Sequence, residues 1–198
     1  RREARVRLRL GHHRRLVLRP LEGDAEGGGQ LDPPGLLHAQ PLVQLAQLRL
    51  DLDVLVVDMD WHYNQPPRGG WTGYTWNRSL FPSPEGFLGW VKQQGLKVTM
   101  NLHPADGIKT WEDRWPQVAQ YMGMDTTQRK DIPYEGSNRR FMTALLDKVL
   151  TPMEQAGVDF WWIDWQQGTK TAVPGLDPLW ALHHYHFYDN AKNNNRPL

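Results

Sequence analysis

The run from Gly157 to Gly168 restricts the fold more than any other stretch of this chain. Its centre, residues 160–163 (FWWI), has the apolar and aromatic composition of a buried strand, and a glycine bounds it on each side. Asp164 follows directly at the C-terminal end of this strand. A buried carboxylate is costly unless it is paired or takes part in chemistry. Asp164 is therefore either a functional residue or the cap of the turn that follows the strand.

Two further apolar runs, residues 52–57 (LDVLVV) and 96–102 (LKVTMNL), predict strands earlier in the chain. Helical spacing of apolar residues predicts helices over 85–94, 112–122 and 138–155. Three strand–helix units in series indicate an α/β fold with parallel strands, either an open doubly wound sheet or part of a barrel.

Polar residues at the strand ends favour the barrel. Asp58, His103 and Asp164 each follow the C-terminal end of a different strand, which is where barrel enzymes assemble their sites. No glycine-rich phosphate loop follows any of these strands. A complete barrel takes roughly 250 residues, so about three strand–helix units predict an incomplete (β/α)8 TIM barrel.

The first part of the chain uses a reduced set of amino acids. Residues 1–58 contain only the ten types whose codons can begin with G or C, a pattern typical of a GC-rich gene read in a wrong frame. Glycine and proline clusters at 27–29 and 33–34 interrupt this part further. We therefore expect residues 1–49 to be a mistranslated or disordered segment without native fold, and residues 50–198 to form the partial barrel.

Charge and composition exclude several classes of partner. Residues 51–198 hold fourteen Lys and Arg against seventeen Asp and Glu, a net charge of −3, which argues against a nucleic-acid partner. No apolar run is long enough to span a membrane. The chain has no cysteine, and no acidic residue or cysteine near His183 and His186 completes a tetrahedral metal set. We expect neither a metal nor a cofactor.

Five short motifs, in this order, resemble glycoside hydrolase family 31, the α-glucosidase and α-xylosidase family. They are DMD at 58–60, FP at 81–82, GFL at 86–88, GLKV at 95–98 and WID at 162–164. The resemblance implies a retaining glycosidase that acts on α-glycosidic bonds of an oligosaccharide or glycoside. It also implies that Asp164 is the nucleophile and that Asp58 binds sugar hydroxyls.

The chemistry of the residues agrees with this resemblance. A retaining glycosidase needs an ionised carboxylate at the anomeric carbon and a second carboxyl about 5–5.5 Å away. Trp162, two residues before Asp164 and hence on the same side of the strand, offers a flat apolar face to a sugar ring. Trp61 and Trp165 could do the same, although for any single one of these Trp a core position is the better interpretation. His103 either contacts the substrate or makes a structural hydrogen bond.

Departures from the family pattern restrict what this chain does by itself. Gln166 and Gln167 stand where many members have asparagine and glutamate. The resemblance places the acid/base aspartate beyond Leu198, so we expect a catalytically incomplete fragment whose parent is an α-glucosidase-like enzyme. Two alternatives remain open: a non-catalytic carbohydrate-binding module, and a structural fragment without function.

Overall fold

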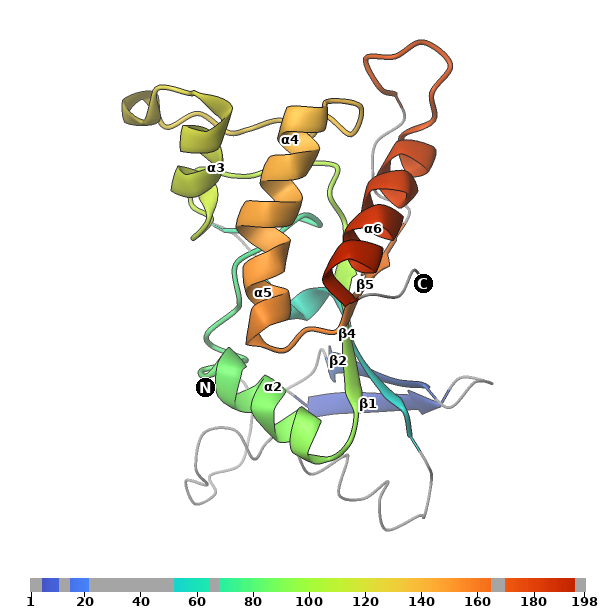
Figure 1. The fold of residues 1–198 in the computed structure, drawn as a ribbon. Coiled ribbons are helices and arrows are strands. Elements are labelled where there is room, and N and C mark those ends of the chain that lie inside the picture. The colour runs from blue at the N-terminus through green and yellow to red at the C-terminus, as the bar shows by residue number, and fades with distance from the viewer. Residues whose placement is uncertain (1–4, 11–14, 22–51, 65–67, 165–169, 195–198) are drawn as a thin grey trace. The chain divides into compact units, whose positions relative to one another are not determined.

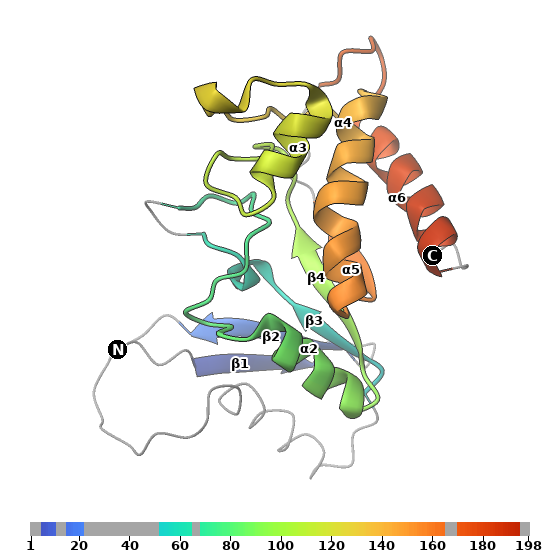
Figure 2. The same ribbon diagram turned by 60° about the vertical axis from the view of Figure 1, so that its left-hand side comes forward.

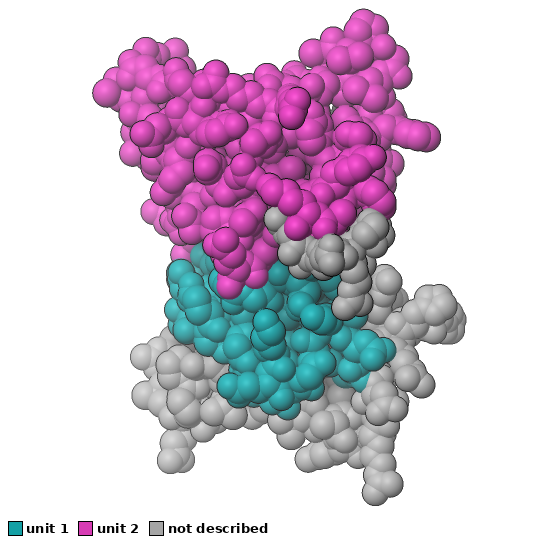
Figure 3. Space-filling view, in the orientation of Figure 1, with its two compact units in different colours: residues 1–61, 76–101, 156–161 teal, residues 62–75, 102–155, 162–198 magenta. Residues whose placement is uncertain are grey.

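The computed structural model describes residues 5–10, 15–21, 52–64, 68–164 and 170–194. The chain forms two compact units (Figure 3). Unit 1 comprises residues 1–61, 76–101 and 156–161, and unit 2 comprises residues 62–75, 102–155 and 162–198. Helices and strands alternate in the order expected for an α/β fold (Figure 1).

Five strands form one sheet in the order β1-β2-β3-β4-β5. They are β1 (Arg5–Leu10), β2 (Arg15–Leu21), β3 (Val54–Val57), β4 (Lys97–Leu102) and β5 (Phe160–Ile163). β1 is antiparallel to β2, whereas β2 is parallel to β3 and β3 is parallel to β4. Two backbone bonds, Asp159 N to Val98 O and Asp164 N to Leu102 O, advance in the same direction along β4 and β5. The three strands predicted from apolar runs are therefore parallel neighbours.

The core of unit 1 is aliphatic on the sheet and aromatic beside it. Leu55, Val56 and Val57 of β3 are all buried, as expected for a parallel strand covered on both faces. Helix α2 (Pro84–Gln93) begins at Ser83, whose Oγ accepts from Gly86 N at 3.3 Å. The predicted helix over 85–94 is thus confirmed to within one residue.

Trp61 belongs to this core. It ends the short 3-10 helix η1 (Met59–Trp61), is fully buried, and its Nε1 donates to Asn101 O at 2.8 Å. Its ring meets Trp76 and Trp161, and Trp76 in turn meets Phe81 edge-on. Of the two interpretations that the sequence left open for Trp61, the core one is right.

Unit 2 contains the other helices. Its elements are α3 (Trp115–Met122), the 3-10 helix η2 (Thr126–Gln128), α4 (Arg139–Ala144), the π-helical segment η3 (Leu145–Leu150), most of α5 (Thr151–Ala156), and α6 (Pro178–Asn194). Helix α3 packs against α4 and η3, and the two views agree on this (Figures 1 and 2). Asn138 caps α4, since its Oδ1 accepts from Arg140 N and Phe141 N. The predicted helix over 138–155 is confirmed, with a π-helical middle that the periodicity did not indicate.

The predicted helix over 112–122 begins three residues later than expected, at Trp115. The reason is that residues 109–115 form two successive turns. The backbone N–H of Glu112 donates to Lys109 O, and the backbone N–H of Trp115 donates to Glu112 O. Tight turns of this kind close without the i to i+4 bonds of a helix.

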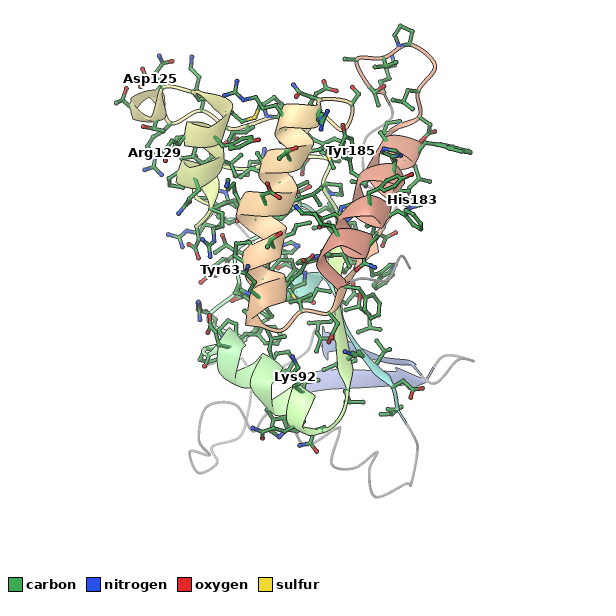
Figure 4. The ribbon with its side chains drawn as sticks, in the orientation of Figure 1. Tyr63, Lys92, Asp125, Arg129, His183 and Tyr185 are labelled. Carbon is green, nitrogen blue, oxygen red and sulfur yellow. The ribbon has the colours of Figure 1, made fainter. Side chains whose placement is uncertain are left out.

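Helix α6 leaves a row of aromatic side chains open to solvent. Trp180 is 75% exposed, Tyr188 62% and Phe187 44%, whereas Ala181 and Leu182 of the same helix are buried. The rings of Phe187 and Tyr188 meet edge-on. Figure 4 shows His183 and Tyr185 on the same helix.

Of the segment 1–49, the structure describes only the backbone of β1 and β2, and the remainder lies outside the described residues. The sequence analysis did not predict these two strands, although Arg alternates with Val and Leu over residues 5–10. The interpretation of residues 1–49 as mistranslated or disordered stays a prediction. In the described part of the chain, no helix has the length and apolar character of a membrane span.

Gly107 is a position where a side chain cannot fit. Its φ is +70°, and an added Cβ would overlap the carbonyl oxygen of Ile132, which accepts the backbone bond from Ile108 N at 2.8 Å. We expect Gly107→Ala to lower the free energy of unfolding by about 2–4 kcal/mol, because left-handed strain and a backbone clash add. Urea denaturation followed by circular dichroism measures this change.

Gly89→Ala is the matched control for this substitution. Gly89 lies within α2, and a Cβ there meets nothing within 4 Å. Alanine at this position should raise the free energy of unfolding by up to about 1 kcal/mol, through helix propensity alone. Equal effects of the two substitutions would contradict the geometric account.

Candidate active site

Asp164 and His103 meet within unit 2. Each is the first residue after its strand, Asp164 after β5 and His103 after β4, and the two strands are neighbours in the sheet. The Nε2 atom of His103 lies 3.3 Å from Oδ2 of Asp164. The His103 side chain is only 2% exposed, whereas that of Asp164 is 29% exposed. The carboxylate thus has one oxygen on a buried imidazole and a part of its surface open to solvent.

Trp71 also contacts His103. Its ring centroid is 5.6 Å from that of His103, at an interplanar angle of 66°. Trp71 is 52% exposed, although the residues that follow it, Thr72 to Trp76, are buried. Asp106 N donates to Thr72 Oγ1 at 3.0 Å and fixes this part of the loop. The sequence analysis did not single out Trp71.

A second histidine, His62, is buried in the same unit. Burial lowers the pKa of His62 to about 4; its bond with Tyr63 O opposes this shift, and nearby His103 adds to it. The imidazole is therefore neutral at pH 7. An added Cβ at Gly73 would overlap the ring of His62, so the loop backbone passes directly over this ring.

Glu112 joins the loop of Trp71 to the segment before α3. Its Oε1 accepts from Tyr74 N at 3.1 Å, and its Oε2 accepts from the hydroxyl of Thr75. Thr75 Oγ1 itself accepts from Asp113 N at 2.9 Å. Burial raises the pKa of Glu112 to about 7, against the effect of these hydrogen bonds. Sequence reasoning missed Glu112, because a glutamate before a helical pattern is common.

Trp162 and Asp58 complete the residues predicted from the sequence. Trp162 is half-buried on β5, two residues before Asp164. Asp58 follows β3 and belongs to unit 1, where it is 6% exposed and its Oδ1 accepts from Met59 N at 2.8 Å. The structure therefore brings Asp164 and His103 together and describes Asp58 within the other unit. Residues 165–169, including Gln166 and Gln167, lie outside the described residues.

In the described ranges, no group of three His, Cys, Asp or Glu side chains could hold a metal ion. His183 and His186 do share α6, one turn apart. Burial lowers the pKa of His186 to about 4, which makes its imidazole neutral at pH 7.

The family model described as "Glycosyl hydrolases family 31 TIM-barrel domain" matches residues 42–193. The chain belongs to glycoside hydrolase family 31. This match confirms the family that the five motifs resemble, and it confirms the barrel class predicted from the strand ends. Curated protein sequences include no match to this family 31 chain.

Solved structures share the fold of this family 31 chain. It resembles the α-xylosidase Xac1773 from Xanthomonas citri (13% identity, TM-score 0.56, 80% of this chain and 20% of that one). An α-xylosidase from a soil metagenome, complexed with xylose, gives 10% identity and a TM-score of 0.55 over 79% of this chain and 25% of that one. The family 31 α-glucosidase from Bacteroides thetaiotaomicron gives 15% identity and a TM-score of 0.52, over 85% and 30%.

At these identities the likeness shows the fold alone. The family 31 chain spans between 20% and 30% of the length of these three proteins. The matched region includes Asp164 and His103, which lie within residues 42–193 of the family match. The geometry of this pair is therefore set inside a TIM-barrel domain.

Proposed function

We propose that this chain carries the nucleophile of a retaining glycoside hydrolase that acts on α-glycosidic bonds, with Asp164 in that role. The observation that supports the proposal most directly is the 3.3 Å pair of Asp164 and His103 at the ends of neighbouring strands in a family 31 chain. The side chain of His103 is buried, whereas that of Asp164 is partly exposed to solvent. A sugar can therefore approach Asp164 from solvent.

The pair suggests how Asp164 would act. His103 Nε2, 3.3 Å from Oδ2, would hold the Asp164 carboxylate in place, and this carboxylate would attack the anomeric carbon. The new C–O bond forms as the bond to the leaving oxygen breaks, and an acid must supply the proton that this oxygen takes. Water then hydrolyses the glycosyl-aspartate and retains the configuration.

We further propose that the chain by itself does not turn over ordinary glycosides. The three solved relatives are enzymes of which it matches 20–30%. General acid catalysis is typically worth about 10²–10⁴-fold, and a barrel that holds the ring in place adds to this. The substrates we propose for the complete barrel are α-glucosides or α-xylosides, the classes of substrate after which the three solved enzymes are named.

A fluoride leaving group allows the first step to be tested on the chain alone, because fluoride departs with little help from an acid. Incubation with 5-fluoro-α-D-glucosyl fluoride should leave one glycosyl group, which trypsin digestion and mass spectrometry assign to the peptide 149–170. Label on any other peptide would move the nucleophile away from Asp164. Sugar binding without any label would favour the non-catalytic binding module.

Asp58 is proposed to bind sugar hydroxyls, a role that the family resemblance assigns to it. Asp58→Ala removes a charged hydrogen-bond acceptor, so we expect binding of methyl α-D-glucoside to weaken by about 1–3 kcal/mol. Isothermal titration calorimetry measures this loss. Asp147→Ala is the control, because Asp147 lies on η3 and its carboxylate is 3.9 Å from Lys192. Equal affinities of the two variants would exclude Asp58 from sugar binding.

A further inference from the structure

We propose that Trp71 is a sugar-contacting residue of this site, with its indole ring packing against a pyranose ring bound at Asp164. This inference rests on the proposed function and extends it to a residue of the loop after β3. Its ligand class is an α-linked glucoside or xyloside.

Trp71 lies close to the proposed nucleophile through their shared neighbour His103. The indole meets the imidazole of His103 edge-to-face, at 5.6 Å between centroids, and that imidazole is 3.3 Å from Oδ2 of Asp164. The indole and the proposed nucleophile therefore both contact the imidazole of His103. Within the part of the chain that the structure describes, the other large exposed aromatic side chains lie on α3 and α6.

Trp71 also has a large solvent-exposed surface. About half of its surface, 52%, is open to solvent, and an indole in water is an apolar surface without a partner. The axial C–H groups of a pyranose form a flat apolar patch of similar size, and aromatic faces in binding sites pack on such patches. The part of the indole that contacts His103 is covered by the imidazole. A ligand can therefore cover only the part of the indole that is open to solvent.

The loop that carries Trp71 is anchored by the residues that follow it. Directly after Trp71 the chain enters the interior, where Thr72 accepts from Asp106 N and Tyr74 N donates to Glu112. Thr72, Tyr74 and Thr75 are 2%, 3% and 5% exposed. The backbone directly after the indole is thus anchored, and the ring itself contacts His103 before a ligand binds. A pre-positioned ring loses little conformational entropy on binding, which is the condition under which an exposed aromatic side chain contributes to affinity.

The test compares Trp71→Ala and Trp71→Phe with Trp180→Ala in the full 198-residue chain. Trp180 is 75% exposed on α6, so it controls for the removal of an exposed indole. Affinities for methyl α-D-glucoside and methyl α-D-xyloside are measured by calorimetry. We expect Trp71→Ala to weaken binding of one of these sugars by about 10-fold, Trp71→Phe to retain part of the affinity, and Trp180→Ala to match the wild type.

A spectroscopic readout separates contact from a purely structural role. With 5-fluorotryptophan incorporated, the ¹⁹F resonance that is missing in Trp71→Phe should shift when sugar is added, and the one missing in Trp180→Ala should not. Circular dichroism and the unfolding midpoint check that each variant is folded. If Trp71→Ala does not fold, the wild-type ¹⁹F titration, with the resonance assigned through Trp71→Phe, is the deciding measurement.

The outcomes distinguish this inference from the proposed function. A wild-type chain that is neither labelled at Asp164 nor binds either sugar would overturn both. Labelling at Asp164 with equal sugar affinity in Trp71→Ala and the wild type would overturn the role of Trp71 alone. Equal weakening by Trp71→Ala and Trp180→Ala would also overturn it, because the loss would not depend on the position of the indole.

Discussion

Replacing Asp164 with asparagine is expected to lower the rate of covalent labelling by 5-fluoro-α-D-glucosyl fluoride by several orders of magnitude. Asparagine has the shape of aspartate, and its side-chain oxygen can still accept from His103 Nε2. Its amide lacks the negative charge that attacks the anomeric carbon. Sugar affinity should therefore change by no more than about 10-fold, while the labelling rate, followed by intact-protein mass spectrometry, falls almost to zero.

Asp159→Asn is the matched control for this prediction. Asp159 lies on the same tryptic peptide, and its carboxylate binds Lys97 Nζ at 2.9 Å and Val98 N at 2.8 Å. Asparagine can keep the bond from Val98 N, so labelling should continue at close to the wild-type rate. Wild-type labelling in Asp164→Asn, or its loss in both variants, would show that Asp164 is not the nucleophile.

The free energy of unfolding is expected to depend on pH through Glu112. Burial raises its pKa in the folded chain from the ordinary 4.5 to about 7. Between these two values the folded chain holds a proton that the unfolded chain has released. The stabilising contribution is therefore complete below pH 4.5 and is lost as the pH rises through 7. The full effect amounts to up to about 3 kcal/mol.

Glu112→Gln should remove this dependence. Glutamine is neutral at every pH and keeps an acceptor for Tyr74 N, so the variant should be the more stable protein above pH 7 and should match the wild type near pH 4.5. Urea denaturation at several pH values gives the difference between the two proteins. Parallel curves would contradict the account of Glu112.

The comparison of the wild type with Glu112→Gln is necessary because two buried histidines change the free energy of unfolding with pH in the opposite direction. Burial lowers the pKa of His62 and His186 to about 4 from the ordinary 6.5. Their contribution is complete above pH 6.5 and is lost as the pH falls through 4. Both proteins share these histidines, so the difference isolates Glu112. Glu85→Gln on the exposed face of α2 is a control for the change of charge.

Elements with strong local signals could be predicted from the sequence. β3, β4 and β5 follow from continuous apolar runs, and the capped helices α2 and α4 follow from helical spacing. The proximity of His103 and Asp164 follows from one topological rule, since neighbouring parallel strands end at the same edge of a sheet. The 3.3 Å pair of these side chains agrees with that rule.

Features that depend on distant partners could not be predicted. Glu112 receives its hydrogen bonds from Tyr74 and Thr75, which are 38 and 37 positions away in the chain. The location of Trp71 depends on the same bonds, because they set the path of its loop. No local pattern records them, so neither residue was a candidate. The π-helical segment η3 was also missed, since one extra residue per turn leaves an apolar pattern that still reads as α-helical.

The exposed rings of Trp180, Phe187 and Tyr188 on α6 also determine how the purified chain will behave in the laboratory. Attraction between apolar surfaces weakens on cooling and strengthens in sulfate and phosphate salts. Chains that meet through α6 should therefore adhere to each other most in warm, sulfate-rich buffers, and least in cold buffers of low salt. Ammonium sulfate fractionation would select for adhesion at this helix, so ion exchange in the cold is the gentler route to monodisperse material.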